Sequence, residues 1–240
     1  MSAVPTPLLE HVASLNALPP TPIGAGFFSV PDSAICKKAE AFVGEYLPTW
    51  MGNHAFRTYA SALAIPNHAG WDGGDKAREL GIHRELIFLA RVLREMGFDA
   101  KDSLKSRMSL ELWGGIMARK WILAQEEDLV AAGRSPELLL GGFSSHCNFT
   151  LALVVLAAGH GLPGLSNAFV HEDEVKAICD KWPRRGYCAG LSRHTKLELE
   201  RKPACMFEDF LPLFNSGMFE VDVFESVQSE LDNDKGGRKT

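Results

Sequence analysis

The chain of 240 residues has a formal net charge of -5, with 46% hydrophobic and 23% charged residues. These values are typical of a soluble globular protein with one well-packed core. The acidic balance excludes the basic surface with which proteins bind nucleic acids or anionic membranes. It favours a small ligand that is uncharged or organic, and it leaves the oligomeric state open, a homodimer included.

Prolines and polar residues divide the chain into an N-terminal arm over residues 1–31, one helical domain over residues 32–226 and a disordered tail over residues 227–240. Six of the thirteen prolines lie in the arm, and proline cannot continue a long helix. The tail is charged and contains glycine, so we expect it to be disordered.

Within the domain, apolar residues recur at helical spacing, and glycines, prolines and capping residues indicate where each helix begins and ends. We expect Asp32 or Ser33 to cap the first helix, Pro66 to end the second and Gly97 to cap the third. A loop is expected over residues 68–81. The expected helices span residues 34–47, 54–65, 83–97, 108–125, 145–158, 171–182 and 193–202. Because no alternating strand pattern and no internal repeat occurs, the predicted fold class is all-α.

The five cysteines form no Cys-x-x-Cys pair, a pattern typical of buried thiols in a reducing compartment rather than of disulfides or a zinc site. We therefore expect a cytoplasmic protein. The longest apolar run, from Leu151 to Ala158, is shorter than the roughly 20 residues that cross a bilayer. The first residues also lack the pattern of a secretion signal, so we expect neither secretion nor membrane insertion.

Three segments place polar residues where a buried helix is otherwise apolar. They are Asn53-His54-Ala55-Phe56-Arg57-Thr58-Tyr59, Ala90-Arg91-Val92-Leu93-Arg94-Glu95-Met96-Gly97 and Lys105-Ser106-Arg107-Met108-Ser109-Leu110-Glu111-Leu112-Trp113-Gly114-Gly115. In order and spacing they resemble the cyanamide hydratase branch of the HD-domain proteins, which is best known from fungi. Its helices carry Asn-His-Ser-x-Arg-x-Tyr, Leu-Leu-His-Asp-x-Gly and Lys-Met-Ser-Phe-Glu-x-x-Gly-Gly in turn. The similarity extends from Ala34 to Leu213 and implies an HD-domain-like helical bundle.

The resemblance also implies a metal ion, such as zinc, held by a histidine of the first segment, the His-Asp pair of the second and an aspartate of a later helix. Only His54 matches these ligands directly. Arg94 and Glu95 replace the pair, and a guanidinium has no lone pair for a metal. No Asp or Glu occurs between Cys147 and His171 to supply the later aspartate. Because even open zinc sites keep three protein ligands, we predict a chain that uses no metal and no other cofactor.

The fixed charge of Arg94 is predicted to take the place of the metal's charge, since a guanidinium can polarise a carbonyl but cannot generate hydroxide. His54, with Glu95 beside it, would then move a proton. These three residues are the predicted catalytic residues. The residues predicted to bind the substrate are Arg57, Ser106, Arg107, Ser109, Glu111, Trp113, His146 and His160.

The predicted function is that of a metal-independent lyase, isomerase or cyclase, acting on a small organic substrate in fungal specialised metabolism. Two alternatives stay open. One is a metal-dependent, cyanamide hydratase-like hydrolase or lyase, in which His146 or His160 supplies a missing ligand. The other is a non-catalytic binding protein, in which an inert buried polar network is formed by His54, Arg57, Glu95 and Glu111.

Overall fold

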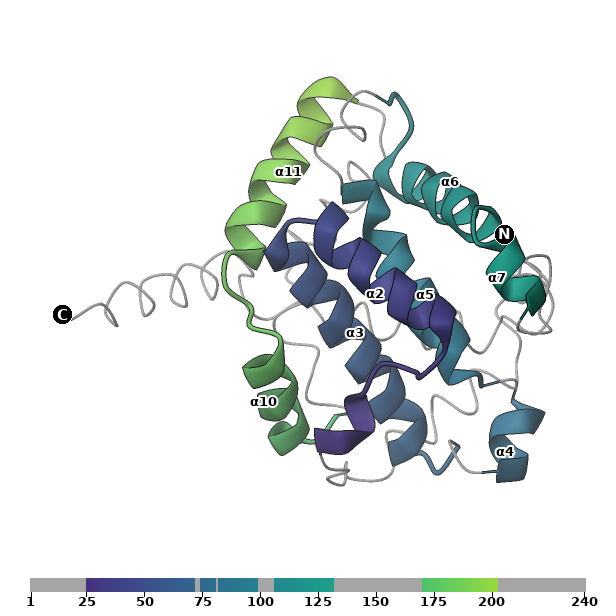
Figure 1. Cartoon of the computed structure of the whole chain (residues 1–240). Helices are drawn as coiled ribbons and strands as arrows, with labels where there is room; N and C mark the ends of the chain where they lie inside the picture. The colour runs from purple at the N-terminus through teal and green to yellow at the C-terminus, as the bar shows by residue number, and fades with distance from the viewer. Residues whose placement is uncertain (1–24, 72–73, 81, 99–105, 132–169, 203–240) are drawn as a thin grey trace.

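The computed structural model describes residues 25–71, 74–80, 82–98, 106–131 and 170–202, and every element within these ranges is helical (Figure 1). The elements are η1 (Ala25–Phe28), α2 (Ala34–Tyr46), α3 (Thr49–His68), α4 (Gly74–Glu79), α5 (Arg84–Arg94), η2 (Glu95–Phe98), α6 (Leu110–Leu123), α7 (Glu126–Ala131), α10 (Glu172–Lys181) and α11 (Tyr187–Arg201). The predicted all-α fold is confirmed for this part of the chain. None of its helices is both long enough and apolar enough to cross a membrane. The expected helix over 145–158 lies outside the described residues.

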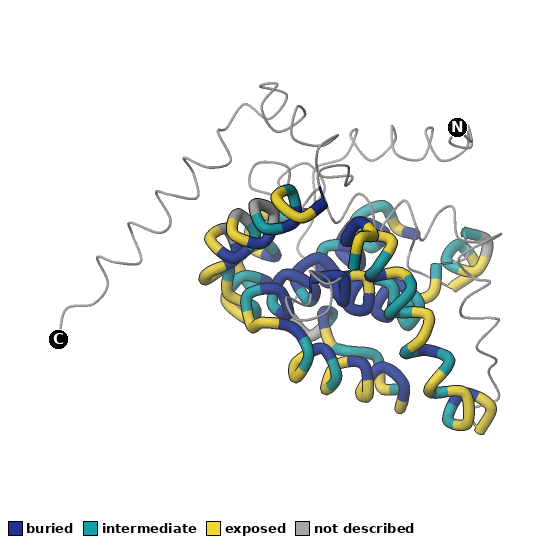
Figure 2. Tube along the Cα trace, turned by 90° about the horizontal axis from the view of Figure 1, so that it is seen from above, coloured by how far each residue is buried: buried dark blue, intermediate teal, exposed yellow. Residues whose placement is uncertain are grey.

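Helix α3 is the central element of the described bundle. It packs against α5 and α2 on one side and against α10 and α11 on the other (Figure 1). Most of its residues between Met51 and Pro66 are buried, and they form the dark centre of the tube in Figure 2. A helix that is buried on nearly all sides can present polar side chains to an interior site.

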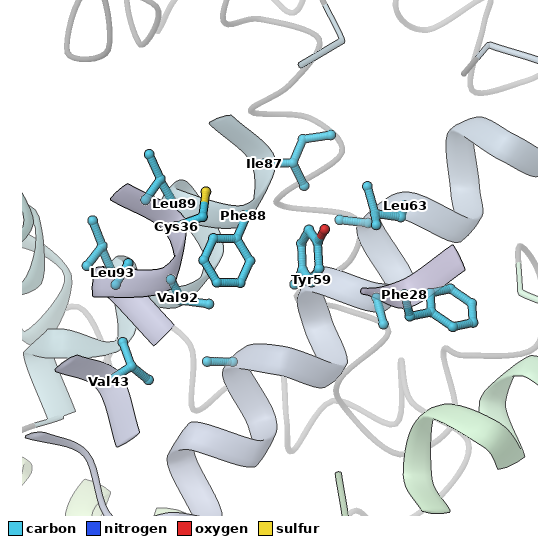
Figure 3. Packing of buried hydrophobic residues seen from close by; sticks show 14 of the residues in the cluster. Phe28, Cys36, Val43, Tyr59, Leu63, Ile87, Phe88, Leu89, Val92 and Leu93 are labelled. Atoms are coloured by element: carbon cyan, nitrogen blue, oxygen red, sulfur yellow. The ribbon is translucent and has the colours of Figure 1, made fainter. Parts of the chain in front are cut away.

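The main core lies between η1, α2, α3 and α5 (Figure 3). Tyr59 of α3 meets Phe88 of α5 edge to face, with ring centroids 5.0 Å apart. The Tyr59 hydroxyl donates to the carbonyl oxygen of Ser29 at 3.0 Å, which ties the segment after η1 to this core. Residues 25–31 of the expected N-terminal arm therefore pack against the bundle through Phe28 and Ser29.

Two predictions about the end of α3 are wrong: that Pro66 ends this helix and that residues 68–81 form a loop. Helix α3 begins at Thr49 and continues through Pro66 to His68. Proline removes the bond that its own N–H would donate and crowds the carbonyl four residues earlier, but only Asn67 and His68 follow Pro66 in the helix. The expected loop over 68–81 contains α4. By contrast, Ser33 caps α2 as predicted, because its Oγ accepts from the N–H of Cys36 at 3.4 Å.

The end of α5 lies close to α6, and two glycines permit the approach. Gly97 is not the left-handed helix cap that we expected: it belongs to η2, and its φ is not positive. A Cβ on Gly97 would lie 2.2 Å from the carbonyl oxygen of Leu110, and a Cβ on Gly114 would lie 2.6 Å from that of Arg94. The backbones of the two elements therefore meet at the position where Glu95 leaves α5.

Helix α11 begins at Tyr187, before the expected start at residue 193. Gly186 precedes it in the left-handed region, at φ 72°, where a side chain would be strained. Ser192, which we expected to cap this helix, lies inside it. Gly190 faces α3, because a Cβ there would lie 2.3 Å from the ring of Trp50. The earlier start of α11 brings Tyr187 into the bundle.

The neighbouring glycines of α6 provide a test of the close approach to α5. We expect Gly114→Ala to lower the free energy of unfolding by about 1–3 kcal/mol, because the added methyl group meets a backbone oxygen that cannot move alone. Gly115→Ala has no atom within 4 Å of its Cβ and should raise stability by about 0.5–1 kcal/mol through its higher helix propensity. Denaturant unfolding of both variants measures the difference. Equal effects of the two substitutions would contradict this packing.

Candidate functional site

His54 lies in the buried part of α3, with 6% of its surface exposed. Its imidazole stacks on the ring of Tyr187 from α11, with centroids 4.5 Å apart and an interplanar angle of 21°. The Nδ1 atom is buried and has no hydrogen-bond partner among the described residues. A buried polar atom of this kind is uncommon in proteins and is a position where a ligand can bind.

Glu95 joins His54 to two arginines. It caps the C-terminus of α5 and is buried. Its Oε1 atom lies 3.9 Å from Nε2 of His54, 3.5 Å from a terminal nitrogen of Arg91 and 3.5 Å from Nη1 of Arg94. These distances are longer than those of ideal charge-assisted hydrogen bonds. The structure thus places all three predicted catalytic residues, His54, Arg94 and Glu95, around one carboxylate oxygen.

Arg91 is a member of this site that our sequence analysis did not include. Its side chain is fully buried. Burial lowers the pKa of Arg91 to about 10, and the charge of Glu95 acts in the opposite direction, so the guanidinium is still protonated at neutral pH. The signal for this residue was its spacing of four from Glu95, which places the two on one helix face.

Arg57 connects the site to the segment between α10 and α11. Its Nη1 atom donates to the carbonyl oxygens of Trp182 and Pro183 at 3.0 and 2.9 Å. Its guanidinium carbon lies 5.5 Å from the centre of the Tyr187 ring. Asn53 donates to the same Pro183 oxygen at 3.1 Å. Tyr187 was also missed, because the expected start of α11 at residue 193 left it in a loop.

The surroundings of His54 favour its neutral form. The pKa of His54 lies well below its ordinary value, first because the ring is buried and then because of the positive charges of Arg91, Arg57, Arg94 and Arg184. The imidazole is therefore uncharged at neutral pH, and its burial and the nearby positive charges oppose its protonation. The same guanidiniums would stabilise a negative charge that forms beside it.

The predicted substrate-binding residues on and before α6 show no contact with His54, Arg94 or Glu95 among the hydrogen bonds, ion pairs and ring contacts of the described residues. The Oγ atom of Ser106 accepts from the N–H of Met108 at 3.0 Å, and Arg107 is exposed. The hydroxyl of Ser109 and the indole nitrogen of Trp113 are buried and have no hydrogen-bond partner in the part of the chain that the structure describes. His146 and His160 lie outside the described residues, as does the side chain of Glu111.

The donor set was tested for its fit to a metal ion. Within the described ranges, no group of three or more His, Cys, Asp or Glu side chains is arranged to hold one. His54 and Glu95 supply two donors, whereas catalytic zinc sites use three. The guanidiniums of Arg91 and Arg94 also lie 3.5 Å from the carboxylate that would bind the ion, so an ion on Glu95 would be close to two positive charges, which repel it. The described residues do not fit a divalent metal.

A second buried ionisable cluster lies further along α11. Lys202 donates to Oε1 of Glu198 at 2.8 Å, and Nε2 of His194 lies 3.9 Å from Oε2 of the same carboxylate. All three residues are buried. The ring of His194 also contacts Phe98, with centroids 5.0 Å apart. In this cluster one carboxylate offsets one lysine, whereas several arginines gather around His54.

The low pKa of His54 predicts how stability depends on pH. The unfolded chain binds a proton at His54 near its ordinary pKa of about 6.5, and the folded chain binds it only at lower pH. This contribution to stability is therefore full above about pH 6.5 and is lost as the pH falls further, by up to about 1.4 kcal/mol per pH unit. We expect His54→Gln to make the pH dependence of the free energy of unfolding shallower in this range. The exposed His83 is a control, and an identical effect of His83→Gln would contradict the prediction.

No protein-family model matches the chain. Over 184 residues it is 22% identical to two proteins of Saccharomyces cerevisiae, cyanamide hydratase DDI2 and cyanamide hydratase DDI3, and the match covers 72% of this chain and 76% of each relative. The resemblance in the three polar segments thus extends to a weak similarity over most of the sequence. The chain is related to cyanamide hydratase-like proteins.

Proposed function

We propose that the chain is an enzyme that transforms a small organic substrate by proton transfer at His54 without a metal ion, as a lyase, isomerase or cyclase. One observation carries this proposal: a buried, neutral imidazole lies 3.9 Å from a carboxylate and is surrounded by guanidiniums. The lone pair of such a group is free at neutral pH. Its surroundings weaken it as a base, but the fixed cations stabilise the substrate anion that forms when it accepts a proton, which offsets part of that cost.

The geometry supports a mechanism in which Glu95 orients His54. When the Nε2–H of His54 faces Oε1 of Glu95, Nδ1 holds the lone pair that takes a proton. The stacked ring of Tyr187 holds the imidazole plane. The proton would leave a carbon next to a substrate carbonyl, and the electron pair would move onto the carbonyl oxygen near Arg94. Return of the proton to another carbon gives an isomerase, and departure of a leaving group gives a lyase.

The relatives support the enzyme class. Both are named cyanamide hydratases, and the segment that carries His54 matches the corresponding family pattern. Because both come from a fungus and the site offers acid–base rather than redox groups, we propose fungal specialised metabolism as the setting.

A second candidate is a metal-dependent hydratase, and the names of the two relatives favour it. In this case the chain would add water to a nitrile such as cyanamide. It would need at least one metal ligand besides His54 and Glu95. The charges of Arg91 and Arg94 beside Glu95 argue against this candidate.

Metal analysis separates the two candidates. We expect the purified chain to contain no stoichiometric zinc or iron and to keep its activity in a chelator, because the described donors do not fit a divalent ion. Elemental mass spectrometry measures the metal content, and a cyanamide hydration assay with and without added zinc tests the second candidate. Stoichiometric zinc together with zinc-dependent hydration of cyanamide would overturn the metal-independent proposal.

Substrate consumption tests the catalytic residues directly. The chain is incubated with small-molecule extracts, in the presence of a chelator, and mass spectrometry identifies compounds that are consumed. We expect His54→Gln and Arg94→Leu to slow the turnover of such a compound, because each raises the activation free energy by on the order of 3 kcal/mol. Arg94→Lys should recover only part, because lysine lacks the planar fork of arginine.

Arg119→Leu serves as the matched control for these substitutions, because Arg119 is exposed on α6. It should leave turnover unchanged. Folded Arg94→Leu and His54→Gln proteins that consume the compound at the wild-type rate would refute the proposed roles.

A further inference from the structure

The arginines around His54 differ in how exposed they are and in how many hydrogen bonds they already make. Arg91 is fully buried, and Arg57 is 3% exposed and donates to two main-chain carbonyls. Arg184 donates through Nε to the sulfur of Cys179 at 3.4 Å. The side chain of Arg94 is 44% exposed. Of these four, Arg94 is the most exposed, whereas Arg184 is partly exposed.

Arg94 retains most of its hydrogen-bonding capacity. A guanidinium has five N–H donors, and the contact that Arg94 makes with a described side chain is a single one of 3.5 Å to Oε1 of Glu95. Arg91 lies at the same distance from that oxygen. One carboxylate oxygen thus lies near two guanidiniums, and among the described side chains Arg94 does not make the paired short bonds that arginine forms with a dedicated carboxylate.

This arrangement matches one class of ligand group. A planar guanidinium at the edge of a water-poor site binds carboxylate or phosphate oxygens through two parallel N–H donors. Such a group would also offset positive charge that Glu95 shares between two arginines. A neutral nitrile or amide would supply no compensating charge.

We infer that the site binds a substrate through an oxyanion, a carboxylate or phosphate group, held by the guanidinium of Arg94 beside Arg91 and Glu95. This inference rests on the proposed function and specifies its substrate class. It differs from the uncharged ligand that the acidic composition of the chain favours, because the local charge around His54 has the opposite sign to that of the whole protein.

Calorimetric titration with paired probes tests the inference. Acetate and benzoate are compared with acetamide and benzamide, which have nearly the same shapes but no charge, and inorganic phosphate and phenyl phosphate form a second arm. We expect at least one charged probe to bind and its binding to weaken as salt is added, whereas the amides should not bind. Tighter binding of the carboxylates indicates an organic acid as substrate, and tighter binding of the phosphates indicates a phosphorylated one.

Substitutions test whether the charged probe binds at Arg94. Arg94→Gln should weaken the bound probe on the order of tenfold, as expected for loss of a charge-assisted pair, and Arg119→Gln should not. In NMR titrations the bound anion should raise the pKa of His54, because it offsets the arginine charges that lower it. The inference is overturned if no charged probe binds, if the amides bind as well as the acids, or if Arg94→Gln binds equally well.

The outcomes also separate this inference from the proposed function. If a metabolite is consumed in a His54-dependent way but no charged probe binds, the oxyanion inference fails and the catalytic proposal stands. If charged probes bind through Arg94 but His54→Gln consumes every compound at the wild-type rate, the catalytic proposal fails and the oxyanion site stands.

Discussion

The burial of the Arg91 guanidinium beside Glu95 is the constraint on which the rest of the site depends. A charge that is removed from water is costly unless it has a partner, and Glu95 is one partner of Arg91, at 3.5 Å. The carboxylate must therefore face inward at the end of α5, although Arg94 next to it is half exposed. His54 lies within reach of Glu95 as a result, and the charges around it keep its ring neutral.

Packing of backbone on backbone maintains this inward direction. The turn η2 follows α5 at once, and α6 contacts it through positions where only glycine fits, Gly97 and Gly114. A main chain held on both sides has little freedom to rotate Glu95 outward. The polar site thus depends on Gly114 of the neighbouring helix α6. Viewed in the sequence alone, a glycine inside a helix only lowers helix propensity.

The sequence predicted those features whose causes are local. Helical spacing predicted the all-α fold and most of the helices that the structure describes, and the serine before α2 predicted its cap. Arg91 and Tyr187 were missed because their roles depend on contacts between distant helices. Gly97 was interpreted as a cap because caps and close contacts select the same residue. The end of α3 was misplaced at Pro66 because the sequence does not show how many residues can follow a proline before the helix ends.

The contacts of Arg57 also affect the order in which the protein can fold. This residue donates to the carbonyl oxygens of Trp182 and Pro183, which lie 125 and 126 positions later in the chain. Closing so long a loop has an entropic cost and slows the formation of the contacts it brings together. A chain that has folded only as far as α7 therefore lacks the Tyr187 ring on His54 and both carbonyls on Arg57. The elements η1, α2, α3 and α5 all lie within residues 25–94, but the site is complete only after α11 has docked.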